Sequence, residues 1–199
     1  MNPNQAPNRA DTLRKSEMKA LDSLARQTIA TYIRAKDENR PYLMKRAFAD
    51  SATLEMIAKP GTISFPPVAN GIDAITDILV RQFAQSYENV HTFCLASPPQ
   101  DDDKTFSCRW LVGMSEKATR QIRVGCGRYD WVFQMTRPRL AERLTVTIDL
   151  MQTLPPADLE LVMDWLSCLP YPWCSSRSAV ETAPTVENLE PVIHYISVA

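Results

Sequence analysis

The chain has 199 residues, of which 45% are hydrophobic and 23% charged, and this is the composition of an ordinary globular domain with a sizeable core. Its 22 basic and 23 acidic side chains leave a net charge of -1, which provides no long-range field to attract nucleic acid or an anionic membrane surface. No apolar run approaches the length of a membrane span, and the N-terminus lacks the apolar stretch of a signal peptide. We therefore expect a cytoplasmic protein that binds neither nucleic acid nor membrane.

The first half of the chain is predicted to alternate helices with a short hairpin. Residues 1–11 are polar, and we expect them to be disordered. A stripe of apolar residues at helical spacing then predicts a long helix that ends near Asp37, because Pro41 follows closely and the residue before a proline is pushed away from helical torsions. Two further helices are predicted at residues 41–49 and 71–86, with strands at 53–58 and 62–65 between them.

The second half of the chain is predicted to be a meander of long antiparallel strands. The expected strands cover residues 89–97, 105–114, 119–135 and 139–152. Alternation is clearest in the last of them, where one face carries Leu140, Leu144, Val146, Ile148 and Leu150. Strands of this length must twist, and Gly113, Gly125 and Gly127 mark positions where the sheet can bend or bulge.

Two adjacent prolines, Pro155 and Pro156, end this unit and begin a C-terminal extension of residues 155–199. Apolar residues at helical spacing predict a helix at 157–169. An aromatic segment at 170–174 is expected on the domain surface, followed by a polar, linker-like stretch to residue 190. The final residues, 192–198, are predicted to form a strand that pairs within the chain or with another subunit.

The five cysteines are odd in number and form no CxxC pair (Cys94, Cys108, Cys126, Cys168 and Cys174). Three of them lie inside apolar strand patterns, which favours small buried thiols in a reducing compartment over disulfide bonds or a metal site. The two histidines, His91 and His194, lack the Cys or carboxylate spacing of a zinc site. The sequence therefore predicts no protein-ligated metal.

The order of the elements, together with several local motifs, resembles the SnoaL-like and scytalone-dehydratase-like branch of the NTF2-like superfamily. The matching features are Tyr32 and Asp37 at the end of the first helix, Phe48-Ala49-Asp50-Ser51-Ala52-Thr53, Gly71-Ile72-Asp73-Ala74-Ile75, His91, and Gly127-Arg128-Tyr129-Asp130-Trp131. The likeness covers roughly residues 12–154. It implies an α+β fold, the NTF2-like (cystatin-like) cone, with three helices packed on a strongly curved antiparallel sheet and the C-terminal extension outside it.

The resemblance also implies a pocket in the cone for a small organic ligand, chemistry that needs no cofactor, and a homodimer formed through the open face of the sheet. That face of long strands would otherwise expose a large apolar patch. Relatives of this fold include both enzymes and non-catalytic binding or assembly modules, so the fold alone does not define a reaction.

The resemblance implies that Asp37 and His91 match an aspartate and a histidine in the active site of such relatives. A carboxylate can orient an imidazole, and an imidazole that titrates near neutrality can move a proton to or from a bound enol or hydroxyl. Tyr129, with Tyr32 as the other candidate, could donate to a developing enolate oxygen. Structural roles are open to each of them: Asp37 could end the helix, and His91 and the tyrosines could be ordinary packed residues.

The predicted pocket residues are Tyr32, Phe93, Trp110 and Cys126. Strand alternation shows which neighbours share a face but not which face is concave, so the last three could line either the pocket or the opposite side. A dehydratase site of this kind uses two histidines, and no second histidine lies in the cone region.

Two functions follow as hypotheses. The first is a cofactor-independent lyase, isomerase or cyclase that uses acid–base chemistry on a small, apolar, oxygenated molecule. The second is a binding or assembly module of the same fold, and the missing histidine and the long extension favour it.

Overall fold

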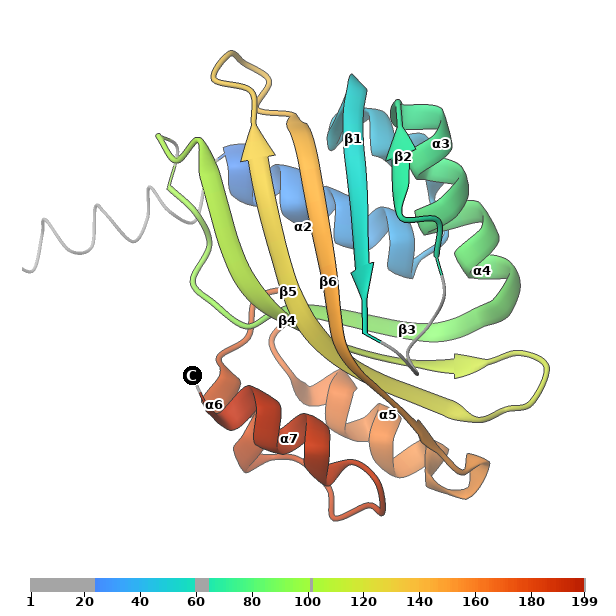
Figure 1. The fold of residues 1–199 in the computed structure, drawn as a ribbon. Helices are drawn as coiled ribbons and strands as arrows, with labels where there is room; N and C mark the ends of the chain where they lie inside the picture. The colour runs from blue at the N-terminus through green and yellow to red at the C-terminus, as the bar shows by residue number, and fades with distance from the viewer. Residues whose placement is uncertain (1–23, 60–64, 101, 199) are drawn as a thin grey trace, which may run out of the picture.

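The computed structural model describes residues 24–59, 65–100 and 102–198. Within them, a curved six-stranded sheet carries helices on both faces (Figure 1). The strands are β1 (Phe48–Ala58), β2 (Val68–Asn70), β3 (Tyr87–Cys94), β4 (Thr105–Glu116), β5 (Ile122–Phe133) and β6 (Ala141–Leu154). The start of the first predicted helix, near Asp11, and the N-terminal segment that was predicted to be disordered lie outside the described residues, as does most of the predicted strand at 62–65.

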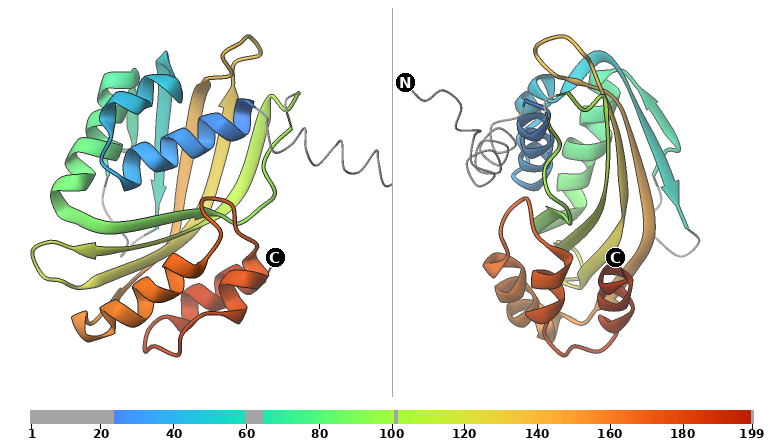
Figure 2. Two further views of the ribbon diagram at one scale, coloured as in Figure 1. Left: turned by 180° about the vertical axis from the view of Figure 1, so that it is seen from behind. Right: turned by 90° about the vertical axis from the view of Figure 1, so that its left-hand side faces the viewer.

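The helices form two groups that are separated in the sequence. The first group comprises α2 (Leu24–Asp37), the 3-10 helix η1 (Pro41–Arg46), and the continuous run of α3 (Ile72–Thr76), the π-helix η2 (Asp77–Gln82) and α4 (Phe83–Ser86). The second group belongs to the C-terminal extension: η3 (Pro156–Asp158), α5 (Leu159–Cys168), α6 (Ser176–Glu181) and α7 (Glu190–Ser197). Figure 2 shows α2 across one face of the sheet and the extension gathered at its lower end.

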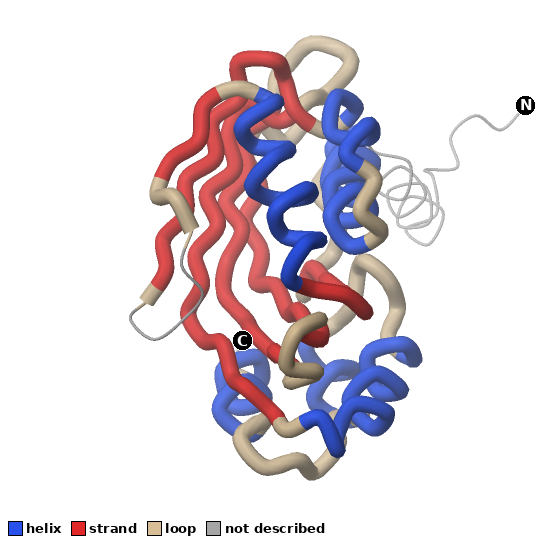
Figure 3. Tube along the Cα trace, turned by 90° about the vertical axis from the view of Figure 1, so that its right-hand side faces the viewer, coloured by secondary structure: helices blue, strands red, loops and turns tan. Residues whose placement is uncertain are grey.

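The strand order is β2-β1-β6-β5-β4-β3, and Figure 3 shows how the strands bend along their length. The predicted α+β cone is confirmed, with one correction to its sheet. β1 and β6 are parallel, whereas the other neighbouring pairs are antiparallel. Strand periodicity predicts a strand but not its direction, and β1 and β6 are not joined by a hairpin that would force antiparallel pairing.

The concave face of the sheet is covered by the first group of helices. On α2 the buried positions include Ala25, Ile29, Tyr32 and Ile33, which repeat at helical spacing and face the sheet. The Tyr32 ring meets that of Trp131 edge-on, with centroids 5.4 Å apart. Edge-to-face contacts of this kind stabilise a core by about 0.5–1.5 kcal/mol beyond the burial of apolar area. The predicted apolar stripe of the first helix is therefore confirmed.

The opposite face holds a second core beneath the C-terminal extension. Its buried members include Phe93, Leu111 and Cys126 from the sheet and Leu166 and Val192 from the extension. The open apolar face that was expected to form a dimer is thus covered by the chain itself over this part. Where the same face remains uncovered, the strands carry polar side chains such as Arg128, Asp130, Arg143 and Thr145, of which the two arginines are exposed.

The predicted strand at 192–198 is wrong, because this segment forms helix α7. Pro191 lies in the first turn of α7, where its fixed torsion favours a helix. Val192 and Ile196, four residues apart, are then both buried against the second core. The β-branched residues that suggested a strand are held in a helix by this packing.

Two further predictions need correction. The predicted helix at 41–49 stops at Arg46, and Phe48 already belongs to β1. Leu150 was expected on the same face as Leu144, but a register shift places Cys126 opposite Leu150 and Gly127 opposite Ile148. The extra residue reverses the alternation of β6, so Leu150 packs on the second core.

Segment 170–174, which was expected on the surface, lies along the edge of β3. Cys94 donates its N–H to the carbonyl of Pro172 and accepts a hydrogen bond from the N–H of Cys174. We call residues 170–174 the strap. It satisfies backbone groups that would otherwise be left open on an edge strand. None of the described helices is long and apolar enough to cross a membrane.

Candidate functional site

A cavity of about 50 Å³ lies between the first group of helices and the concave face of the sheet. Its walls are mainly aliphatic and thioether side chains, including Met56, Leu79, Val146 and Met151. Tyr32, Lys36 and Tyr129 are the ionisable side chains in this lining. The cavity is thus an apolar space with a few polar groups on its wall, as is usual for small-molecule sites.

Tyr32 and Tyr129 form the phenolic part of this wall. They are 1% and 3% exposed, their ring centroids are 6.1 Å apart, and their side chains share a hydrogen bond. Burial raises the pKa of both phenols, so they remain protonated at neutral pH. Trp110 stacks on Tyr129 with 5.7 Å between centroids and also lines the cavity. Tyr32, Trp110 and Tyr129, three of the candidate site residues, therefore lie together on the wall of this cavity.

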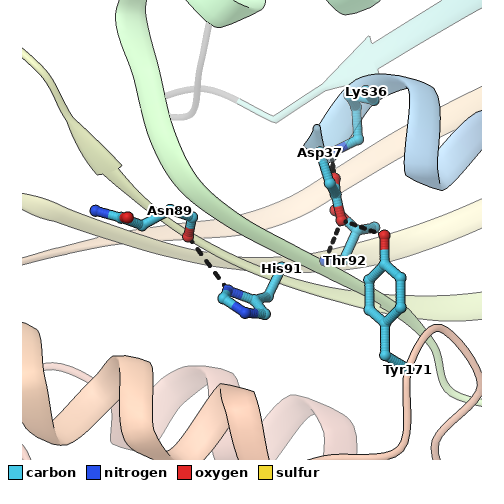
Figure 4. A network of polar contacts seen from close by, with 6 residues as sticks. All are labelled: Lys36, Asp37, Asn89, His91, Thr92 and Tyr171. Carbon is cyan, nitrogen blue, oxygen red and sulfur yellow. Dashed lines mark hydrogen bonds and ion pairs between the residues drawn. The ribbon is translucent and has the colours of Figure 1, made fainter. Parts of the chain in front are cut away.

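A buried ion pair lies at the C-terminal end of α2 (Figure 4). Lys36 Nζ lies 2.6 Å from Asp37 Oδ1, and the two side chains are only 6% and 3% exposed. Thr92 donates to the same carboxylate through its backbone N–H and its hydroxyl, each over 2.8 Å. Lys36 also donates to the Thr92 hydroxyl over 2.7 Å. Asp37 therefore joins the end of α2 to β3, and its charge is compensated by several donors.

The predicted pair of Asp37 and His91 is not brought together. His91 precedes Thr92 on β3, and successive strand residues point to opposite faces. Thr92 faces Asp37, whereas the His91 ring points away and lies 3.3 Å from the carbonyl oxygen of Asn89 (Figure 4). The geometry does not support an imidazole that exchanges protons with Asp37.

Phe93 and Cys126 were expected in the pocket, and the structure places both in the second core on the other face. Strand alternation predicts that each side chain points to the face opposite that of its sequence neighbours. It does not predict which face is concave, because that depends on the helices that cover the sheet. Burial raises the pKa of the Cys126 thiol to about 12, which makes it a poor nucleophile.

Three residues of the polar network were missed from the sequence: Lys36, Thr92 and Tyr171. Lys36 follows Tyr32 by four residues and continues the apolar stripe of α2, so a charged residue at a core position was the available signal. The strap brings Tyr171 to Asp37, and its hydroxyl donates to Oδ2 over 3.1 Å. No local pattern in the sequence predicts that contact. The described residues also contain no group of three His, Cys, Asp or Glu side chains arranged to hold a metal ion.

No protein-family model and no curated protein matches the sequence. Several solved structures are similar in fold. The crystal structure of LinA aligns with a TM-score of 0.54 at 9% identity, over 73% of this chain and 94% of that one. A hexachlorocyclohexane dehydrochlorinase (LinA) of type 2 gives 0.51 at 12% identity, over 72% and 93%. An NTF2-like superfamily protein from Salmonella enterica serovar Typhimurium gives 0.50 at 13% identity, over 71% and 94%.

These similarities establish that the chain has the NTF2-like fold, as the resemblance of its motifs and element order predicted. At such low identities they do not extend to an activity, because this fold carries unrelated functions.

Proposed function

We propose that the cone binds a small, largely apolar molecule that carries one oxygen able to accept hydrogen bonds. The observation that supports this most is the apolar cavity with Tyr32, Tyr129 and Lys36 on its wall. The proposal corresponds to the non-catalytic small-molecule-binding module predicted as the alternative.

The number of donors at the wall argues for an acceptor oxygen on the ligand. The phenols of Tyr32 and Tyr129 have two O–H donors in total, and the hydrogen bond between them uses one. No acceptor for the other O–H is found among the residues that the structure describes. An ammonium group has three N–H donors, and Lys36 gives two of them to Asp37 and Thr92. A carbonyl, ether or hydroxyl oxygen on the ligand would accept hydrogen bonds from these remaining donors.

The volume of the cavity limits what it holds as it stands. A space of about 50 Å³ corresponds to a few water-sized positions, since one water needs roughly 10–15 Å³ on this scale. A molecule of about four or five non-hydrogen atoms is the appropriate size. The most favourable affinity of so small a ligand is about 1.5 kcal/mol per atom, which makes a Kd in the micromolar to millimolar range realistic.

Binding of 2-butanone, followed by protein-observed NMR, tests the proposal. Shifts confined to the signals of cavity residues are expected. The double variant Tyr32→Phe/Tyr129→Phe removes both hydroxyls and should weaken binding of 2-butanone by roughly tenfold, because one hydrogen bond to a buried acceptor is lost. Tyr42→Phe, at an exposed position on η1, is the matched control. Shifts spread over the surface, or an unchanged Kd in the double variant, would contradict the proposal.

The second candidate function is acid–base catalysis, by a lyase, isomerase or cyclase that uses the polar side chains on the same cavity wall. The Lys36 ammonium and a phenol could stabilise an enolate oxygen. The predicted base is the weak point, because His91 lies elsewhere and Asp37 already accepts from Lys36, Thr92 and Tyr171. Exchange of the α-protons of 2-butanone in D₂O separates the candidates. An exchange rate equal to that of buffer favours binding alone, and a faster rate that disappears in the Lys36→Met variant favours catalysis.

A further inference from the structure

We infer that Phe83 is a movable partition, and that its displacement lets the cone take a longer, amphipathic ligand whose apolar ketone-like end lies in the inner cavity. This inference rests on the proposed binding function and concerns the size and chemistry of the ligand.

Phe83 borders three separate spaces. It lines the inner cavity, a second hollow of about 220 Å³, and a third of about 190 Å³. Lys36 is shared by the inner cavity and the second hollow, so these two are divided by Phe83 and Lys36. Both neighbouring hollows are larger than the inner cavity, and the Phe83 ring borders all three spaces.

The surroundings of Phe83 leave it room to turn. Its ring contacts Lys36 Nζ at 4.8 Å from the centroid and the Tyr87 ring at 4.9 Å. The side chains of a well-packed core are in close contact on all sides, without voids of this size. Phe83 instead borders three hollows although it is only 8% exposed. The ring can therefore rotate into a neighbouring hollow without displacing the backbone.

The backbone before Phe83 is unusual in the same place. Residues 77–82 form the π-helix η2, and Phe83 is its C-terminal neighbour. A π-helical turn is rare, and such turns occur often at functional sites. Leu79 within η2 and Phe83 after it both line the inner cavity. The widened turn thus carries one side chain of the cavity wall, Leu79, and directly precedes another, Phe83.

The second hollow determines the chemistry of the ligand's outer end. Its lining includes the polar residues Asn39, Glu88, Asn89 and Lys117, with both signs of charge present. The inner cavity is apolar apart from its phenols and Lys36. A ligand that spans both spaces is therefore apolar in its body, carries an acceptor oxygen at the inner end, and ends outside in a neutral group that forms hydrogen bonds.

A matched pair of ketones tests the inference. 2-Butanone fits the inner cavity alone, and 4-(4-hydroxyphenyl)-2-butanone adds a ring with a neutral polar end that must pass Phe83. We expect Phe83→Ala to bind the longer ketone roughly tenfold more tightly and with a faster association rate than the wild-type chain, because the partition is removed. The affinity for 2-butanone should change by less than about threefold. Phe83→Leu, which retains more of the packing, should show the same trend, and circular dichroism verifies the fold of each variant.

Phe106→Ala is the control, because Phe106 is a partly buried phenylalanine outside the three spaces. It should leave the affinity for both ketones unchanged. If the longer ketone binds to wild type, Phe83→Ala and Phe83→Leu with equal affinity and rate, the partition is refuted while the binding function stands. If 2-butanone binds and the longer ketone binds to none of the three, the amphipathic ligand is refuted. If neither ketone binds to any of them, the proposed function fails as well.

Discussion

The hydroxyl of Tyr171 donates a hydrogen bond to Oδ2 of Asp37 across 134 positions of sequence. The contact joins the strap to the last residue of α2 and therefore connects the C-terminal extension to the wall of the cone. Tyr171 also packs edge-on against Phe93 of the second core, with 5.9 Å between ring centroids. One side chain thus links the end of α2 to the second core.

Removing this hydroxyl should lower the free energy of unfolding. We expect Tyr171→Phe to cost about 1 kcal/mol, because a hydrogen bond to a carboxylate is lost while the ring contact with Phe93 remains. Urea denaturation measures the difference. Tyr42→Phe, at a residue that is 57% exposed, provides the baseline for the same chemical change. Equal stabilities of the two variants would show that the contact with Asp37 contributes nothing.

Breaking the Lys36–Asp37 pair should have a larger effect. Lys36→Met leaves a carboxylate that is 3% exposed without its cation. The loss of one partner from a buried pair typically destabilises by about 3–5 kcal/mol. The double variant Lys36→Met/Asp37→Asn removes the stranded charge and should be more stable than Lys36→Met alone, a coupling that a double-mutant cycle measures. If the two single losses simply add, the pair is not energetically coupled.

The sequence predicted the elements of the cone better than the partners within it. Helical spacing on α2 and alternation in the strands follow from local geometry, and the structure has both Tyr32 and Tyr129 on the cavity wall. The faces of Phe93 and Cys126 depended on which side the helices cover, and this is a property of the whole fold. His91 failed for a smaller reason: Thr92, its neighbour on β3, is the residue that faces Asp37. The bulge that places Leu150 on the other face of the sheet is likewise not predicted by a strict two-residue period.

Thiol reactivity should separate one cysteine from the other four. Cys168 is exposed, whereas Cys94, Cys108, Cys126 and Cys174 are buried. Burial also raises the pKa of Cys94, Cys126 and Cys174, which lowers the fraction of reactive thiolate. Titration of the native chain with an aromatic disulfide reagent should therefore give one fast equivalent, and the denatured chain should give five.

The variant Cys168→Ser identifies the reactive thiol, because it should remove the fast phase entirely. A second fast equivalent in the native chain would mean that part of one core opens on the timescale of the reaction, since Cys94 and Cys108 lie in the first core and Cys126 and Cys174 in the second.

Asp149, which bonds to the C-terminal extension, should make the free energy of unfolding depend on pH. Burial alone raises the pKa of its carboxyl, but the contacts with Lys59 and Tyr195 outweigh this and leave the pKa below its ordinary value. Tyr195 on α7 donates to Asp149 over 2.6 Å, so the carboxylate holds the last helix against β6. A folded-state pKa below the unfolded one, which is about 3.9, gives stability that is present above that pH and is lost as the pH falls through the folded value.

The measurement is the free energy of unfolding of wild type and Asp149→Asn as a function of pH. We expect a difference of about 1 kcal/mol that is constant between roughly pH 8 and pH 5 and shrinks below about pH 4. Asp77→Asn is the control, because the Asp77–Arg81 pair is exposed on both sides and such pairs contribute roughly 0–1 kcal/mol. A difference for Asp149→Asn that persists unchanged at acid pH would mean that the stabilisation by Asp149 does not depend on ionisation of its carboxyl group.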